Sequence, residues 1–204
     1  MQFPVVVVAG ASSNVGKTTL VCRLLEHFPD WEAIKVTRGH YRSCGRDPHT
    51  CCVSHLLGDA PKVFSERSLT DVPNKDTGRF WTAGASNVHW LIATTNQIEH
   101  GIHLALERVK GPGVLVEGTS ILEFLQPSLS ILTLSGPENR LKSTAQRALR
   151  ERRIDVVFNS SDGSKLDGLV DADLPVFCPS NINELVAHIK KGSLPWERWP
   201  LAGA

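Results

Sequence analysis

The segment from Ala9 to Leu20, AGASSNVGKTTL, constrains the fold more than any other part of the chain. It follows the apolar run VVVV and precedes TTLVCRLLEHF, in which apolar residues recur at helical spacing. Residues Ala11 to Thr18, ASSNVGKT, match the looser form of the phosphate loop, with Ala in place of the first Gly. Because backbone N–H groups and the helix dipole attract anions at such a helix start, we predict that this loop binds the phosphates of a nucleotide.

The residue types of the loop suggest separate roles. Gly16 lets the backbone approach the ligand, and the Lys17 ammonium reaches the β- and γ-phosphates. The Thr18 hydroxyl is placed to bind Mg²⁺, and Thr19 follows near the α-phosphate. The predicted nucleotide-binding residues of the loop are Ser13, Asn14, Val15, Gly16, Lys17, Thr18 and Thr19.

Short apolar runs alternate with segments of helical spacing along the chain. Runs that do not alternate with polar residues are typical of strands buried on both faces of a parallel sheet. The pattern predicts an α/β fold of the P-loop NTPase type, a doubly wound, mostly parallel sheet of about seven strands flanked by helices. The predicted strands are Phe3–Ala9, Ala33–Val36, Val88–Ala93, Val114–Val116, Leu129–Leu134, Ile154–Phe158 and Pro175–Cys178, and the predicted helices are Lys17–Phe28, Asn96–Val109, Glu138–Arg152 and Asn183–Lys190.

The length of 204 residues favours one domain. We predict a single nucleotide-binding domain over residues 1–192, with a loop-rich insertion at about 38–84, and a Pro- and Trp-rich C-terminal tail at 193–204. A helix near Cys51–Leu57 and a strand at Lys62–Ser65 are the only regular elements suggested within the insertion. We expect it to lie over the carboxyl edge of the sheet, where such folds bind their ligands.

Charge and cysteine content exclude some classes of function. Lys and Arg number 22 against 21 Asp and Glu, so no basic field is expected to recruit nucleic acid. The first apolar run is short and has no basic residues before it, so we expect a buried strand rather than a signal peptide or membrane span. The odd number of cysteines, 5, is a poor disulfide framework, which favours a cytoplasmic protein.

Polar residues close several of the predicted strands. Glu117 follows VLV directly, where its carboxylate could bind Mg²⁺ or position a water or substrate group. Lys35 ends the second strand and could meet a phosphate or an acidic substrate, although a solvated strand-end lysine is equally natural. Asn159 could bind the nucleotide base, with Asp162 close by, or could simply form the turn NSSD. Lys17, Lys35 and Glu117 are therefore the predicted catalytic residues, and Thr18 and Glu117 the predicted metal ligands.

Taken together, these pieces resemble the molybdopterin-guanine dinucleotide biosynthesis protein B family, small GTP-binding P-loop proteins that assist molybdenum cofactor maturation. The similar segments are ASSNVGKTTL, AIKVT, KDTGRFWTAGA, VLVEG and LPVF. The resemblance implies that Lys75, Asp76, Thr77 and Arg79 lie near the nucleotide or its substrate, and that the chain is a homodimer. The chain has Val36 where that family has a histidine, and NVGKT is also similar to the loop of the related dethiobiotin synthetases.

Three functions are compatible with these features. The first is a GTP-binding accessory protein of molybdenum cofactor biosynthesis with weak hydrolysis or none, acting with a partner protein. The second is an ATP-dependent enzyme, like dethiobiotin synthetase, that phosphorylates or ligates a small anionic substrate with the help of Mg²⁺. The third is a nucleotide-switched metallochaperone.

The third function depends on the stretch GHYRSCGRDPHTCCVSH. It contains the imidazoles and thiols that zinc prefers, but none of the familiar zinc spacings. The alternative is a substrate loop whose arginines, Arg38, Arg42 and Arg46, attract an anionic ligand. The possible metal ligands are His40, Cys44, His49, Cys51, Cys52 and His55.

Overall fold

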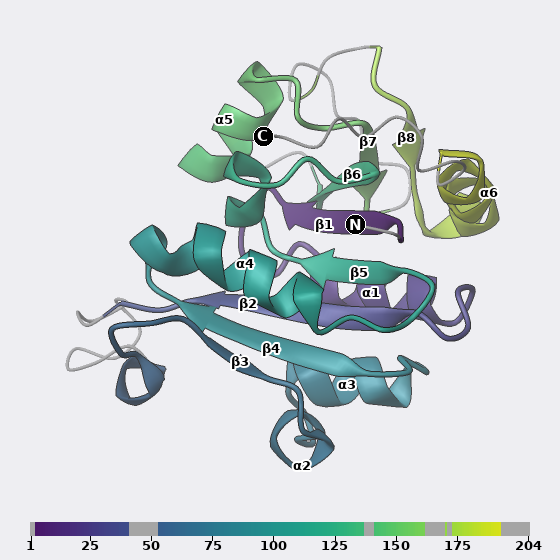
Figure 1. Cartoon of the computed structure of the whole chain (residues 1–204). Helices are drawn as coiled ribbons and strands as arrows, with labels where there is room; N and C mark the ends of the chain where they lie inside the picture. The colour runs from purple at the N-terminus through teal and green to yellow at the C-terminus, as the bar shows by residue number, and fades with distance from the viewer. Residues whose placement is uncertain (1–2, 41–52, 137–140, 162–169, 171–172, 193–204) are drawn as a thin grey trace.

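A single sheet organises the computed structural model, which describes residues 3–40, 53–136, 141–161, 170 and 173–192. Within these residues the sheet has 8 strands in the order β3-β4-β2-β5-β1-β6-β7-β8 (Figure 1). All neighbours are parallel except β3 and β4, which are antiparallel at the edge. The strands are β1 (Val5–Gly10), β2 (Glu32–Arg38), β3 (Lys62–Phe64), β4 (Val88–Ala93), β5 (Val114–Glu117), β6 (Leu129–Leu134), β7 (Val156–Asn159) and β8 (Val176–Phe177).

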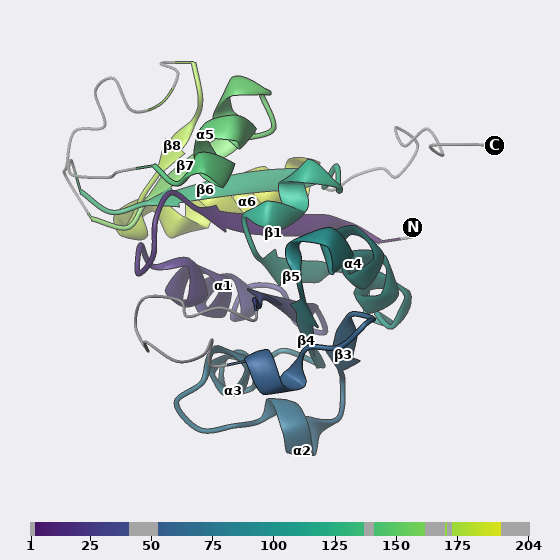
Figure 2. The same cartoon turned by 90° about the vertical axis from the view of Figure 1, so that its left-hand side faces the viewer.

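Helices cover both faces of this sheet, which confirms the predicted doubly wound α/β fold (Figure 2). One face packs against α1 (Lys17–Leu25), α3 (Asp76–Thr82) and α6 (Ile182–Gly192). The opposite face packs against α4 (Ile98–Glu107) and α5 (Ser143–Arg150). The remaining helical pieces are α2 (Arg67–Thr70) and the 3₁₀ turns Ser54–Leu56, Thr95–Gln97, Ser120–Glu123 and Pro179–Asn181.

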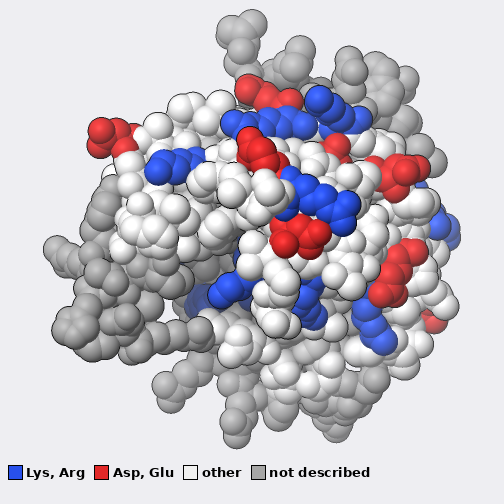
Figure 3. Space-filling view, turned by 90° about the horizontal axis from the view of Figure 1, so that it is seen from below, with Lys and Arg blue, Asp and Glu red and all other residues white. Residues whose placement is uncertain are grey.

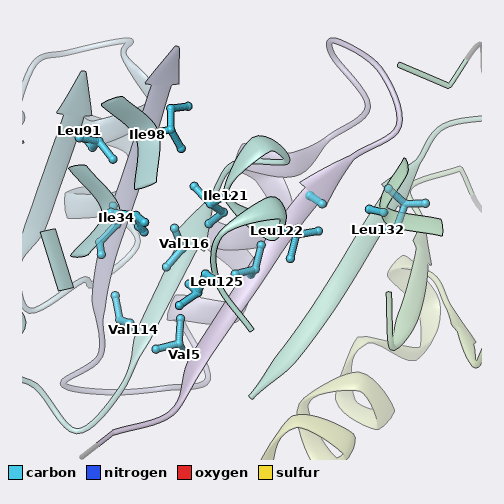
Figure 4. Packing of buried hydrophobic residues seen from close by; sticks show 14 of the residues in the cluster. Val5, Ile34, Leu91, Ile98, Val114, Val116, Ile121, Leu122, Leu125 and Leu132 are labelled. Atoms are coloured by element: carbon cyan, nitrogen blue, oxygen red, sulfur yellow. The ribbon is translucent and has the colours of Figure 1, made fainter. Parts of the chain in front are cut away.

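The apolar core follows from the buried strand β1. Its residues alternate between the two faces, so Val5 and Val7 pack under α4 while Val6 and Val8 pack under α1. Figure 4 shows the first of these layers, in which Val5, Val114 and Leu125 lie close together. Each fully buried aliphatic side chain of this kind contributes about 1.5–3 kcal/mol to folding. The continuous apolar runs in the sequence therefore reflect burial on both faces.

The topology places the loop after β1 at the centre of the sheet. Strand β1 lies between β5 and β6, and the chain leaves it through α1 to reach β2 on one side and only later reaches β6 on the other. In doubly wound sheets, ligands bind outside the carboxyl ends of the strands at such a point. The loop after β1 therefore faces the crevice that this fold uses for ligands.

The segment predicted as a loop-rich insertion contains more regular structure than its sequence suggested. The helix α3 was not predicted, because 7 residues are too few to show a helical period. Gly78 allows this helix to approach the preceding loop, since a Cβ atom there would lie 2.2 Å from the carbonyl oxygen of Val72. The predicted strand at Lys62–Ser65 is present as β3. In place of the predicted helix near Cys51–Leu57, the structure has a 3₁₀ turn over Ser54–Leu56. Cys51 and Cys52, the first residues of the predicted helix, lie outside the described ranges.

The face formed by α2 and α3 shows how charge is distributed on this side of the molecule. Basic and acidic side chains are intermingled on it, and neither sign dominates (Figure 3). One such neighbour pair is Arg67 and Asp71, with 3.1 Å between Nε and Oδ2. Among the described helices, none combines the length and the apolar character that a bilayer span requires.

Candidate functional site

The phosphate loop begins at the carboxyl end of β1 and ends at the first residue of α1. Asn14 and Gly16 have φ angles of 60° and 89°, a left-handed conformation that glycine adopts at little cost. The Lys17 side chain lies over Gly10, where an added Cβ atom would come within 2.6 Å of Lys17 Cδ. The Lys17 ammonium is 3.4 Å from the Ser12 carbonyl oxygen. The loop thus positions Lys17 on the α1 side of the sheet, where its ammonium faces the inside of the loop.

Thr18 and Glu117 meet at the base of this loop. The Thr18 hydroxyl donates a hydrogen bond of 2.9 Å to Glu117 Oε2, and Glu117 is 2% exposed. The register explains the contact: Glu117 ends β5 opposite Val8 of β1, so its side chain shares the face that α1 covers. The structure brings together the two residues predicted as metal ligands.

Lys35 contacts the same carboxylate from the other side. It is the register partner of Glu117 on β2, and its ammonium lies 2.6 Å from Glu117 Oε1. Asp76, the first residue of α3, binds the same ammonium at 2.5 Å. Lys35 therefore links two carboxylates at the carboxyl edge and is not the solvated strand-end lysine that the sequence left open.

The charges of this cluster stabilise one another. Burial alone would lower the pKa of Lys35, but the attraction of Glu117 and Asp76 outweighs it, so the pKa of Lys35 is raised. Burial would likewise raise the pKa of Asp76, but hydrogen bonds from Lys35 and Thr18 lower it. At neutral pH Lys35 is therefore protonated and Asp76 is ionised.

Lys17 is in a different electrostatic position. Its pKa is lowered, chiefly by burial, although the negative charge of Glu117 opposes the change. The positive charges of Lys142 and Lys35 lower it further. An anionic ligand in the loop would relieve this repulsion, which is the behaviour expected of a lysine that binds phosphate.

The other residues implied by the family resemblance are placed around α1 and α3. The Arg79 guanidinium donates a hydrogen bond of 3.2 Å to the Thr19 hydroxyl, so α3 contacts the second threonine of the loop. Thr77 is buried in α3, and Lys75 is exposed before it. Asp76 and Arg79 thus lie beside the predicted nucleotide site.

Asn159 closes β7 near the start of α1. Its Oδ1 atom accepts a hydrogen bond of 3.1 Å from the Ser161 backbone N–H. The next residue, Ser160, lies beside the loop, since a Cβ atom at Gly16 would approach Ser160 Cβ to 3.1 Å. The turn-forming role of Asn159 is therefore observed, and its contact with a nucleotide base stays a prediction. Asp162 lies outside the described residues.

The donor set at the base of the loop fits Mg²⁺. Thr18, Glu117 and Asp76 offer hydroxyl and carboxylate oxygens, the hard ligands that this ion prefers. No group of three His, Cys, Asp or Glu residues that could hold a metal ion occurs in the described parts of the chain. Of the suggested zinc ligands, Cys44, His49, Cys51 and Cys52 lie outside those parts, so zinc binding stays untested.

Lys142 was not identified from the sequence. Its backbone N–H donates a hydrogen bond of 2.7 Å to the carbonyl oxygen of Ala11, the first residue of the loop motif. It precedes α5 and is far from the loop in sequence. Nothing in its local spacing distinguishes it from a surface lysine, so only the tertiary fold shows that it adjoins the site.

Comparisons with known proteins bear on the fold. No family model matches the chain, and no curated protein matches its sequence. Among solved structures, the apo form of LpxK from Aquifex aeolicus in complex with ATP matches with a TM-score of 0.54 and 21% identity, over 87% of this chain and 54% of that chain. MobB from Bacillus subtilis matches with a TM-score of 0.45 and 18% identity, over 94% of this chain and 98% of that one.

A further match is the signal recognition particle receptor FtsY from Elizabethkingia anophelis, with a TM-score of 0.44 and 12% identity over 86% of this chain and 57% of that one. This chain spans about half the length of the LpxK chain. At such low identities, the likeness to LpxK concerns the fold alone. With the strand order described above, the chain has the α/β fold of P-loop NTPases.

Proposed function

We propose that this chain binds a Mg²⁺–nucleoside triphosphate at the loop 11–18 and activates its γ-phosphoryl group for transfer to water or to a second substrate. The observation that carries this proposal is the contact of Glu117 with both Thr18 and Lys35. This contact links the two predicted metal ligands to each other and to the Lys35 ammonium at the base of the phosphate loop. Phosphoryl transfer needs this kind of positioned positive charge rather than covalent chemistry from the protein.

Each side chain has a separate task in this proposal. Lys17 binds the β- and γ-phosphates, and Thr18 and Glu117 hold the metal directly or through water. Mg²⁺ neutralises charge on the phosphate oxygens. Lys35 stays protonated, because Glu117 and Asp76 raise its pKa, and it supplies a fixed positive charge at the carboxyl edge. Asp76 orients Lys35 and shares a hydrogen bond with Thr18, so its carboxylate would lie beside the residues that hold the metal.

Two biological roles would use this site. The sequence motifs support a GTP-binding accessory role in molybdenum cofactor biosynthesis, with slow hydrolysis. The linked cluster of Lys35, Glu117 and Asp76 supports an ATP-dependent enzyme that phosphorylates a small acid, because it adds a protonated amine to the loop lysine at the transfer site. We rank the accessory role first, since five separate segments of the sequence resemble that family.

Calorimetry with non-hydrolysable GTP and ATP analogues tests both parts of the proposal. We expect saturable binding of one analogue that is lost when EDTA removes Mg²⁺. Preference for the GTP analogue supports the accessory role, and preference for the ATP analogue supports the enzyme. Absence of binding of either analogue at millimolar concentration in the presence of Mg²⁺ would contradict the proposed function.

A further inference from the structure

Two cations near the carboxyl edge of the sheet are not used by the proposed nucleotide site. Arg38 is the last residue of β2, and Lys142 immediately precedes α5; both are exposed. Among the described residues, neither has an acidic side chain within ion-pair distance. Within the described part of the chain, neither cation therefore has an ion-pair partner.

The strand alternation places Arg38 on the face opposite the phosphate loop's helix. Lys35 and Glu117 share the α1 face, and Val36 packs against the cluster under α4 and α5. Because side chains alternate along a strand, Arg38 projects to the same face as Val36. Lys142 immediately precedes α5, which covers this face, and its neighbour Leu141 packs against the same cluster.

Backbone contacts connect the segments that carry these two cations. Gly118 follows β5, and a Cβ atom there would lie 3.0 Å from Val36 Cβ, so the chain passes close to β2. The Thr119 hydroxyl bonds the backbone N–H and carbonyl of Gly10 at 2.9 and 3.2 Å. Gly10 leads into the loop, whose first residue binds the Lys142 N–H. These contacts thus link β2, the residues after β5, the start of the loop and Lys142 in turn.

The electrostatics agree with this placement. The pKa of Lys142 is lowered by partial loss of hydration and then by the positive charges of Arg38 and Lys35, although the negative charge of Glu117 opposes this change. Lys142 also lowers the pKa of Lys17. Holding like charges together is unfavourable, and an anion between them would remove the cost.

We propose that Arg38 and Lys142 form a binding site for the carboxylate or phosphate group of a second substrate, on the opposite side of the carboxyl edge from the nucleotide. This inference rests on the proposed function, because it makes the anionic molecule the acceptor or partner of the γ-phosphoryl group. Arg38 offers the planar donors that suit an oxyanion, and Lys142 adds a point charge. The site lies next to Lys17, so a bound acceptor would meet the end of the triphosphate.

The test uses the full chain saturated with Mg²⁺ and the non-hydrolysable triphosphate analogue that the wild type binds, so that added anions cannot occupy the γ-phosphate position. Inorganic phosphate and malonate are titrated separately by calorimetry, which tells a phosphate site from a carboxylate site. We expect at least one anion to bind, with its Kd raised about tenfold or more in Lys142→Ala and in Arg38→Ala, as one charge-assisted contact is lost. Lys142→Arg should retain binding, and Lys62→Ala, an exposed lysine on β3, is the matched control.

The outcomes separate the two proposals. If the wild type binds the analogue but neither anion, or if both alanine variants bind the anion as the wild type does, the second site is wrong and the nucleotide site stands. If Lys142→Ala weakens the analogue itself tenfold or more, Lys142 belongs to the γ-phosphate position and the second site is likewise wrong. If the wild type binds no analogue, both proposals fail.

Discussion

Lys35 and Glu117 are register partners on neighbouring parallel strands, with 2.6 Å between the ammonium and Oε1. Their side chains are therefore held on one face by the sheet itself rather than by a flexible loop. Because Thr18 contacts the other oxygen of Glu117, the phosphate loop and β2 are connected through a single carboxylate. A substitution of Thr18, Lys35 or Glu117 should therefore shift the side chains of the other two.

Removing the loop lysine tests the nucleotide site directly. Lys17→Ala should weaken binding of the Mg²⁺–triphosphate analogue by about 1.5–3 kcal/mol, the contribution of a hydrogen bond to a charged group. Calorimetry on the variant and on the control Lys62→Ala measures this difference. Equal affinities in Lys17→Ala and the wild type would show that the loop does not bind the phosphates.

A methyl group at Gly10 should have a similar effect without removing any charge. The added Cβ atom would come within 2.6–2.9 Å of the Lys17 side chain, which must then move away from its present position. We expect Gly10→Ala to lower triphosphate affinity about tenfold while the melting temperature changes little, because the displaced atoms belong to a flexible side chain. Gly192→Ala, where no atom lies within 4 Å of the new Cβ, is the control. Full affinity in Gly10→Ala would mean that the position of Lys17 over Gly10 is unimportant.

Neutralising Glu117 should affect both stability and activity. From the sequence we expect a role in metal binding or catalysis, and the structure adds that this carboxylate is buried and paired with Lys35. Glu117→Gln should cost about 1.5–3 kcal/mol of unfolding free energy, since a charged hydrogen bond is lost, and should reduce Mg²⁺-dependent turnover. Urea unfolding without ligand, together with phosphate release, measures the two effects. Unchanged stability would show that the Lys35 pair contributes nothing net to the fold.

The opposite end of β2 carries a second buried carboxylate with a structural role. Glu32 Oε2 lies 2.7 Å from His89 Nε2, and Oε1 accepts hydrogen bonds from the backbone N–H groups of Lys110 and Gly111 at 2.8 and 2.7 Å. Burial alone would raise the pKa of Glu32, but the hydrogen bonds from His89 and from the two backbone groups outweigh it and lower the pKa. The carboxylate is thus bound in its ionised form, far from the phosphate loop.

This shift predicts a stability difference that depends on pH. The pKa of Glu32 is lower in the folded state than its unfolded value of about 4.3. Its contribution to folding stability is therefore present above about pH 4.3 and is lost as the pH falls through the folded-state pKa. Glu32→Gln should therefore be less stable than the wild type by about 2–4 kcal/mol at pH 7, and the gap should narrow below about pH 4. Urea unfolding between pH 7 and about 3 measures it, with the exposed Glu99→Gln as control. If the difference in unfolding free energy between the wild type and Glu32→Gln stays constant over this range, the lowered pKa of Glu32 is wrong.

The parts of the site that were predicted from sequence share one property: their signal is local. The loop, the strand before it and the helix after it are contiguous, and Glu117 follows an apolar run directly. The pairing of Lys35 with Glu117 depends on the strand order β2-β5-β1, which no local pattern encodes. The same is true of the contact between Lys142 and Ala11, and of the pair formed by Glu32 and His89.

Regular structure was also harder to predict where the elements are short. Residues 54–82 contain a 3₁₀ turn, a 3-residue strand and two helices of 4 and 7 residues, all too short to show a period. Their conformation depends on tertiary contacts such as the hydrogen bond of 3.0 Å from Trp81 Nε1 to Thr70 Oγ1. Asp76 reaches Lys35 only because α3 begins at that residue.

The position of β1 in the sheet has a consequence during synthesis of the chain. The strand emerges before its two neighbours, β5 and β6, which begin only at Val114 and Leu129. Pairings so distant in sequence form slowly, because a long loop must close first. Until then the apolar run VVVVAG has open edges on both sides, a state that favours aggregation over native pairing. The strand that leads into the phosphate loop therefore needs protection until β5 and β6 have been synthesised.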